Sequence, residues 1–296
     1  MIRYLRESAT AGLEGGAVRY PSSVRGGAVG AVIALLAAPN LAGQVRQITV
    51  KGTEYGFEAP DTVDAGVARV RFSSAGEELH HAQLVRLEDG KTIDDLKAWI
   101  RESGAEMLVG DPPSWLTWVG GPGAVPAGDE SNATVALRAG THAWLCLVTT
   151  RPPERAHHFM KGMLRGMTVI GNQRPRLPPS DALLILSDYD FELSRPLTAG
   201  FQTITVRSKA GQRHEVALAR LHPGKTMDDL LAWLSASPAP MPVDVVGGIS
   251  VLDSGEANLL ELDLTAGDYV MLCFVPDSGD GRPHYQHGMI KGITVR

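Results

Sequence analysis

Four side chains that can bind a soft metal ion occur twice in this sequence, in the same order each time. The two sets are His80, Cys146, His158 and Met163, and His214, Cys273, His284 and Met289. Two imidazoles and one thiolate, with a weak axial thioether, make up the trigonal site that copper electron-transfer proteins use. The pattern therefore predicts two soft-metal sites, with one copper ion in each half of the chain.

The two donor sets belong to a tandem repeat. His80–Trp99 and His214–Trp233 are identical at twelve of twenty positions, which is far above chance. All four donor types are retained in both copies, whereas neighbours such as Trp144 and Met271 have diverged. This joint retention favours a metal site over four unrelated residues, each of which alone would indicate core packing or an exposed side chain.

The elements expected to hold the donors are mostly short strands. Each copy is expected to begin with a strand, at Gln47–Val50 and Leu183–Leu186. Period-two alternation then indicates half-buried strands at Ala68–Phe72 and Gln202–Val206, and each cysteine ends an apolar run. Abundant glycine and proline suit many strands joined by turns. We therefore predict an all-β chain of two tandem Greek-key β-sandwiches, each with one inserted helix.

The inserted helix is marked by its N-terminal residues. Thr92 and Thr226 have the pattern of N-caps, with Asp95 and Asp229 at capping-box spacing. Apolar residues then recur on one helix face, namely Leu96, Trp99 and Ile100 in the first copy and Leu230, Trp233 and Leu234 in the second. Further along, each copy has a Val-Gly-Gly motif, Val119–Gly121 and Val246–Gly248, which indicates a bend or a close approach of two backbones.

Composition and charge set the broad class of the protein. The 296 residues carry a formal net charge of -5 and form no basic stripe, so we expect no nucleic-acid partner. Residues 1–43 contain an apolar run, Ala28–Ala38, that is long enough for a signal peptide and too short to span a bilayer. We predict a signal segment at 1–43, domains at 44–171 and 180–296, and export to the periplasm or the exterior with no integral membrane span in the mature chain.

Each copy resembles a cupredoxin, the blue-copper β-sandwich family. Members share an upstream histidine, a cysteine at a strand end, a second histidine and a methionine in a loop before the last strand. The resemblance implies that His80, Cys146, His158 and Met163 bind one copper ion, and that His214, Cys273, His284 and Met289 bind another. Eleven residues separate Cys146 from His158 and ten separate Cys273 from His284, so this loop is longer than in most small members and closer to that of copper nitrite reductases.

The same comparison argues against catalysis. Multicopper oxidases need His-x-His motifs, which this sequence lacks, and nitrite reductases place a histidine directly before the cysteine, where Leu145 and Leu272 stand. We therefore expect electron transfer to a redox partner protein, or copper carriage. The alternative is a metal-free β-sandwich module that binds a protein or cell-envelope partner through the region of Trp115 and Trp118.

Two minor expectations concern residues outside the donor sets. A disulfide between Cys146 and Cys273 is an alternative use of the two cysteines, which the separate cores disfavour. His81, His157 and His287 have no counterpart in the other copy, and we expect them at the surface.

Overall fold

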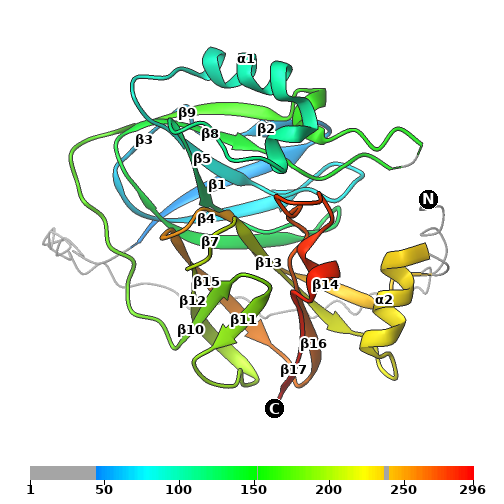
Figure 1. Ribbon diagram of the computed structural model, residues 1–296. Coiled ribbons are helices and arrows are strands. Elements are labelled where there is room, and N and C mark those ends of the chain that lie inside the picture. Colours follow the sequence, from blue (N-terminus) through cyan, green and yellow to red (C-terminus); the bar gives the residue numbers. More distant parts are fainter. Residues whose placement is uncertain (1–44, 152, 237–239) are drawn as a thin grey trace, which may run out of the picture. The chain divides into compact units, whose positions relative to one another are not determined.

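The computed structural model describes residues 45–151, 153–236 and 240–296, and the predicted signal segment at 1–43 lies outside this range (Figure 1). The first repeat contains strands β1 (Arg46–Thr53), β2 (Gly56–Glu58), β3 (Thr62–Asp64), β4 (Gly66–Ser74), β5 (Gln83–Leu87), β6 (Leu116–Gly120), β7 (Glu130–Leu137), β8 (Gly140–Leu145) and β9 (Leu164–Ile170). The second contains β10 (Ala182–Ser187), β11 (Asp190–Leu193), β12 (Gly200–Ser208), β13 (His214–Leu221), β14 (Val243–Leu252), β15 (Ala257–Leu264), β16 (Gly267–Leu272) and β17 (Ile290–Val295).

Each repeat is a two-layer β-sandwich. In the first repeat one layer has the order β2-β1-β4-β7 and the other β6-β5-β8-β9-β3. In the second repeat the corresponding orders are β11-β10-β12-β15 and β14-β13-β16-β17. The chain crosses between layers from β4 to β5 and from β6 to β7, as in Greek-key folds. Side chains on the inner faces are buried, as the alternation predicted, and the all-β prediction is confirmed.

The two sandwiches are joined edge to edge, which the sequence did not predict. β7 pairs with β15 at Thr134 and Leu259, and β6 pairs with β14 at Val119 and Leu252. Each layer therefore continues through both repeats, giving one eight-stranded and one nine-stranded sheet. Val45–Arg296 forms one compact unit, and the predicted domain limits at 171 and 180 stay a prediction.

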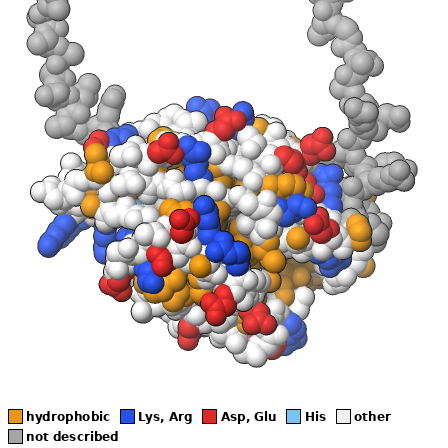
Figure 2. Space-filling model, turned by 90° about the horizontal axis from the view of Figure 1, so that it is seen from above, with side chains coloured by type: hydrophobic (Ala, Val, Ile, Leu, Met, Phe, Trp, Pro, Cys, Tyr) orange, Lys and Arg blue, Asp and Glu red, His pale blue; other side chains and the backbone are white. Residues whose placement is uncertain are grey.

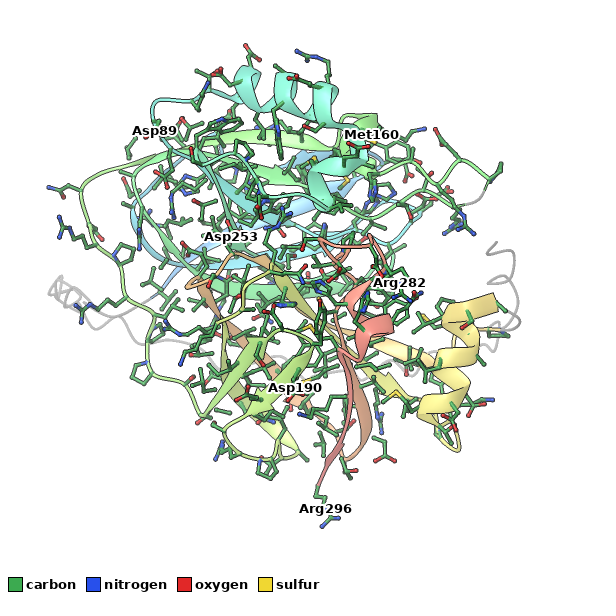
Figure 3. The ribbon with its side chains drawn as sticks, viewed as in Figure 1. Asp89, Met160, Asp190, Asp253, Arg282 and Arg296 are labelled. Carbon is green, nitrogen blue, oxygen red and sulfur yellow. The ribbon has the colours of Figure 1, made fainter. Side chains whose placement is uncertain are left out.

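Side chains strengthen this junction between the repeats. Asn258 accepts a hydrogen bond from the Gly121 N–H at 2.7 Å and donates to the Val119 carbonyl at 2.9 Å. Asp253, which Figure 3 labels near the junction, accepts from the Trp118 N–H at 2.7 Å. Because these bonds are buried or half-buried, breaking them would leave unsatisfied polar groups in the interior.

The Val-Gly-Gly motifs lie at this junction and allow close backbone approach. A Cβ on Gly248 would lie 1.9 Å from the Val216 carbonyl oxygen, and one on Gly121 would lie 2.2 Å from that of Ala82. Both glycines also have positive φ, at 142° and 118°. The prediction of a close approach is confirmed, since no side chain would fit at either position.

The two helices cover the outer face of the second layer, as Figure 1 shows for α1 above β8 and β9. They are α1 (Ile93–Ser103), which continues into the 3-10 segment η1 (Gly104–Leu108), and α2 (Met227–Ala236). Thr92 accepts from the Asp95 N–H at 3.2 Å while Asp95 accepts from the Thr92 N–H at 2.9 Å, and Thr226 and Asp229 do the same. Both predicted capping boxes are therefore confirmed.

The surface carries charges of both signs. On the face in Figure 2, acidic and basic side chains are interspersed rather than gathered into one stripe. In the part of the chain that the structure describes, no helix is long and apolar enough to cross a membrane.

Candidate metal centres

Backbone hydrogen bonds bring the donors of the first repeat together. His80 is held against Val125 by two backbone bonds, at 3.2 and 3.0 Å. Cys146 follows β8, donates its N–H to the Met163 carbonyl at 3.3 Å and accepts from the Phe159 N–H at 2.9 Å. The Met163 N–H donates to the His158 carbonyl at 3.0 Å. The strand end, the 3-10 segment η2 (His158–Lys161) and the start of β9 are thereby fixed as one frame.

The second repeat builds the same frame. His214 begins β13 and pairs with Leu252. Cys273 donates to the Met289 carbonyl at 3.2 Å, and Met289 donates to the His284 carbonyl at 3.0 Å. His284 begins the 3-10 segment η3 (His284–His287). In both repeats a glycine with φ of 103°, Gly162 or Gly288, ends the 3-10 turn and directs the chain into the last strand.

The long loop between cysteine and histidine forms a closed hairpin. In the first repeat Thr149 pairs with His157, and the His158 N–H donates to the Val148 carbonyl at 2.8 Å. In the second repeat Pro276 pairs with Pro283 in the same way. The extra residues are therefore looped outward, and the histidine returns beside the cysteine despite the long separation in sequence.

The donor atoms converge in both repeats. In the first, His80 Nδ1 lies 3.1 Å from His158 Nδ1, and Cys146 Sγ lies 3.9 and 3.5 Å from these two nitrogens. In the second, Cys273 Sγ lies 3.8 Å from His214 Nδ1 and 3.5 Å from His284 Nδ1. The three donor atoms in each group lie within 4.8 Å of one another. The structure thus brings six of the eight expected donors into two tight groups.

The first group has the size of a metal site. A point equidistant from its three donor atoms lies about 2 Å from each, close to the distances at which first-row metal ions bind imidazole and thiolate. All three side chains are fully buried. The donor set, two imidazoles and one thiol in a water-poor pocket, fits a soft metal such as copper.

Protonation in the metal-free protein follows from burial. Burial, together with the neighbouring His158, lowers the pKa of His80 to about 4, and burial with His214 does the same for His284. Burial also lowers the pKa values of His158 and His214, against their carboxylate partners. The imidazoles are therefore neutral at pH 7 and can offer a lone pair. Burial raises the pKa of Cys146 to about 12 and also raises that of Cys273, so a metal ion must displace a proton from each thiol.

A carboxylate orients the loop histidine of the first group. Glu78 Oε2 lies 2.9 Å from His158 Nε2 and accepts its proton in a hydrogen bond. The proton on Nε2 leaves Nδ1 as a free lone pair directed at His80 and Cys146. Partial burial works to raise the pKa of Glu78, but hydrogen bonds from the Arg151 N–H and from His158 lower it overall, so it remains charged. In contrast, His80 Nε2 is buried and has no hydrogen-bond partner among the residues that the structure describes.

The second group places its carboxylate on the other histidine. Asp188 Oδ1 lies 2.9 Å from His214 Nε2, so the upstream imidazole is the one held by an anion. His284 Nε2 instead faces the amide oxygen of Gln212 at 3.4 Å, and Asp277 Oδ2 lies farther away, at 3.8 Å. Gln212 is fixed in this orientation because its amide nitrogen donates to Tyr189 Oη and to Asp277 Oδ2, both at 2.9 Å. The two groups share donors but differ in what supports them.

The methionines complete each frame. Met163 and Met289 are fully buried, and each is hydrogen-bonded through its backbone to both the cysteine and the histidine of its own group. A thioether at this place in each frame is the predicted weak axial ligand. The roles of all eight residues as metal ligands stay a prediction.

Two residues, His81 and Trp118, differ from the sequence-based expectations, and one alternative is excluded. His81 was expected at the surface but is 4% exposed, and its Nε2 accepts from the Leu147 N–H at 2.7 Å. Trp118, proposed as a partner contact, is fully buried beneath Arg213, whose guanidinium carbon lies 5.2 Å from a ring centroid. It therefore cannot form a contact surface. Cys146 and Cys273 are free thiols, each within its own donor group, so the disulfide alternative is wrong.

Functional residues outside the donor sets were not found from the sequence. Glu78 and Gln212 stand two positions before the first histidine of each set, and Asp188 lies far upstream of His214. Glu78 and Gln212 differ in type, so comparing the two repeats for identical residues does not identify them. Their position in the repeat is the only signal that could have found them.

No family model matches this chain, and no curated protein matches it. Solved structures do match. An auracyanin from Roseiflexus castenholzii is 21% identical over 44% of this chain and all of its own, with a TM-score of 0.28. Auracyanin A from Chloroflexus aurantiacus, described as a "blue" copper protein, is 24% identical over 38% of this chain and 99% of its own, with a TM-score of 0.25. A multicopper oxidase is 12% identical over 85% of this chain and 89% of its own, with a TM-score of 0.25.

The strand order and the donor groups themselves define the class of each repeat. Each repeat is a two-layer β-sandwich whose upstream histidine, strand-end cysteine and second histidine converge, with a buried methionine before the last strand. Both halves are therefore cupredoxin-like in fold and in the order of their donors.

Proposed function

We propose that this protein binds one copper ion in each repeat and acts as an electron-transfer or copper-carrying protein. The observation that carries the proposal is the convergence of a thiol and two imidazole Nδ1 atoms in both repeats, each fully buried. A bound copper ion would supply a one-electron redox centre. His80, Cys146, His158 and Met163 would hold one ion, and His214, Cys273, His284 and Met289 the other.

The residues of the protein would prepare each site for such an ion. Glu78 and Asp188 hold one imidazole proton on Nε2, which keeps Nδ1 available. Leu145 and Leu272 stand directly before the cysteines and are buried, so this position offers a hydrocarbon side chain and no further ligand. A fixed, dry donor set with little room for rearrangement favours electron transfer over catalysis. A redox partner protein and an exported location belong to the same proposal.

Copper loading tests the proposal. Recombinant protein treated with Cu(II) and desalted is expected to retain about two ions and to show thiolate-to-copper charge transfer in the visible range. Cys146→Ser is expected to remove the first repeat's share of this absorption, and Cys273→Ser the second's. Met163→Leu and Met289→Leu are expected to change the colour or potential without loss of binding, because the thioether is a weak ligand.

The contrary result is simple to recognise. If the wild-type protein loses its copper on desalting and both cysteine variants behave as the wild type does, the proposal is wrong. The metal-free binding module would then be the better hypothesis.

A further inference from the structure

His81 connects the first donor group to the second repeat. It follows the donor His80 directly, and its Nε2 accepts from the N–H of Leu147, the residue after Cys146, at 2.7 Å. On the opposite side of the ring, Nδ1 lies 3.3 Å from Ser250 Oγ, in strand β14 of the second repeat. One buried side chain therefore contacts both the strand end that carries the thiol donor and a strand of the other repeat.

The partners determine where each proton lies. A backbone N–H can only donate, so His81 Nε2 must be the unprotonated acceptor. The neutral ring then carries its proton on Nδ1 and donates to Ser250 Oγ. The Ser250 hydroxyl in turn donates to the Pro122 carbonyl at 2.7 Å. The result is a directed chain of hydrogen bonds from Leu147 through His81 and Ser250 to Pro122.

Ser250 is itself fixed by the junction between the repeats. Its N–H donates to the Gly121 carbonyl at 2.9 Å. The adjacent Val251 carbonyl accepts from Gln83 Nε2 at 3.0 Å. Because Gly121 and Gln83 belong to the first repeat, the position of the Ser250 hydroxyl depends on how the two repeats pair.

In the second repeat, the residue equivalent to His81 makes no bond to the first repeat among the described contacts. Glu215 occupies the position of His81, and its Oε1 accepts from the Phe274 N–H, one residue after Cys273, at 3.1 Å. Its own N–H donates to Cys273 Sγ at 3.5 Å. Both bonds stay within the second repeat, so the support of this cysteine is local.

We infer that His81 and Ser250 are positioning residues that make the thiol donor of the first metal site depend on the contact between the repeats, whereas the residue that supports the thiol donor of the second site bonds within its own repeat. The inference rests on the proposed function for its metal, but the hydrogen-bond chain belongs to the protein alone. Thermodynamic reciprocity then requires that metal in the first site strengthens the pairing of the repeats. The copper affinity of the first site would therefore fall when the pairing of the two repeats is disturbed.

The test uses the full chain with Cys273→Ser, so that only the first site binds Cu(II). Ser250→Ala is expected to weaken Cu(II) binding about 10-fold and to shift the charge-transfer band, in line with the loss of an outer hydrogen-bond partner. His81→Leu is expected to have a larger effect. His81→Gln should recover most of the affinity, because its amide can accept from Leu147 and donate to Ser250. As the matched control, Ser250→Ala in a Cys146→Ser chain should leave the second site's affinity within about twofold.

A second readout needs no metal. In the copper-free chain, Ser250→Ala and His81→Leu should speed hydrogen exchange of the Leu147 amide and leave that of Phe274 unchanged. If neither variant alters the affinity, the band or the Leu147 exchange, the inference is wrong. If the Cys273→Ser chain binds no copper, the proposed function fails for this site, and the Leu147 exchange alone decides the inference: faster exchange supports it and equal exchange overturns it.

Discussion

Glu78 and Gln212 occupy equivalent positions, two residues before the first histidine donor of their repeats, and differ in charge. Glu78 accepts from His158 Nε2 at 2.9 Å, whereas the Gln212 amide oxygen faces His284 Nε2 at 3.4 Å. A carboxylate partner makes an imidazole a stronger ligand and favours the more positive, oxidised state of a metal site. Asp277 Oδ2 lies 3.8 Å from His284 Nε2, beyond hydrogen-bond distance, so the carboxylate bonded directly to His158 is expected to distinguish the two loop histidines as ligands.

Exchanging the two residues tests this expectation. In a Cys273→Ser chain, Glu78→Gln should raise the reduction potential of the first site and weaken Cu(II) binding about 10- to 100-fold. In a Cys146→Ser chain, Gln212→Glu should change the second site in the opposite direction. Voltammetry and competition titration measure both effects. Glu77→Gln, an exposed neighbour, is the control, and an equal effect of Glu77→Gln and Glu78→Gln would refute the role of Glu78.

His142 makes a separate, pH-dependent contribution to stability. It is buried in β8, and burial lowers its pKa from 6.5 to about 4, with the Gly140 carbonyl and Glu88 opposing and Arg86 reinforcing this shift. Between about pH 6.5 and pH 4, His142 is therefore protonated in the unfolded chain and neutral in the folded chain. Stability from this residue is complete above pH 6.5 and is lost as the pH falls towards 4, at most by about 1.4 kcal/mol per pH unit.

Replacement by the residue of the other repeat isolates this contribution. Tyr269 stands at the equivalent position, where its hydroxyl donates to the Thr265 carbonyl at 2.9 Å. His142→Tyr should reduce the loss of unfolding free energy between pH 7 and pH 5 by up to about 2 kcal/mol. Urea unfolding at the two pH values measures the change. An unaltered pH dependence would show that His142 does not titrate as proposed.

At the scale of elements, the cysteine-to-histidine hairpin of the second repeat depends on Asp277. This buried carboxylate accepts from Tyr189 Oη at 2.5 Å, from Gln212 Nε2 at 2.9 Å and from the Gly279 N–H at 2.8 Å. These hydrogen bonds, led by that from Tyr189, lower its pKa, so it stays charged. Asp277 thus links the hairpin to Gln212, whose amide oxygen faces His284 Nε2.

Asp277→Ala should therefore loosen the hairpin and weaken Cu(II) binding at the second site about 10-fold, with the first site unchanged. Competition titration in a Cys146→Ser chain and hydrogen exchange across 277–283 provide the measurement. Asp280→Ala is the matched control, because this residue is near the hairpin tip and its side chain pairs with the exposed Arg282 and the partly exposed His287. Equal effects of the two variants would contradict this account.

Elements with local signals could be predicted from the sequence. Thr92 and Asp95 predict the start of a helix, because both partners of the capping box lie within one turn. The order of histidine, cysteine and histidine likewise predicted which side chains converge. The outward hairpin could not be predicted, because its closure depends on the pairing of Thr149 with His157 and on tertiary bonds to Glu78.

Other features were missed because different residue types perform the same task. His81 and Glu215 both accept from the N–H that follows a cysteine, so retention of type did not identify them. The joining of the repeats includes isolated strand pairs and buried side chains such as Asn258, which produce no periodic pattern. Such contacts between distant segments are visible only in the folded chain.

At the scale of the whole molecule, both repeats share one core. A single cluster of buried side chains includes residues from both, such as Val70, Trp118, Leu252 and Leu260. The continuous sheets and this shared cluster predict that the copper-free chain unfolds in one cooperative transition rather than as two separate domains.

Copper should then stabilise the entire chain. Each site at 100-fold excess of free ion over its Kd adds about 2.7 kcal/mol by mass action, so Cys146→Ser should roughly halve the copper-induced rise in Tm. Calorimetry with and without Cu(II) measures this. Two well-separated transitions, or complete unfolding on chelation, would show that the repeats are independent or that the metal is structural.

The complete burial of all four histidine donors has a kinetic consequence. His80, His158, His214 and His284 expose no surface, so a chelator in solution cannot touch the ligands while the hairpins remain closed. Release of the ion must wait for local opening of a hairpin. At high chelator concentration the rate of copper loss would then stop rising and equal the opening rate, which makes the residence time of the metal a property of the loops rather than of the ligands.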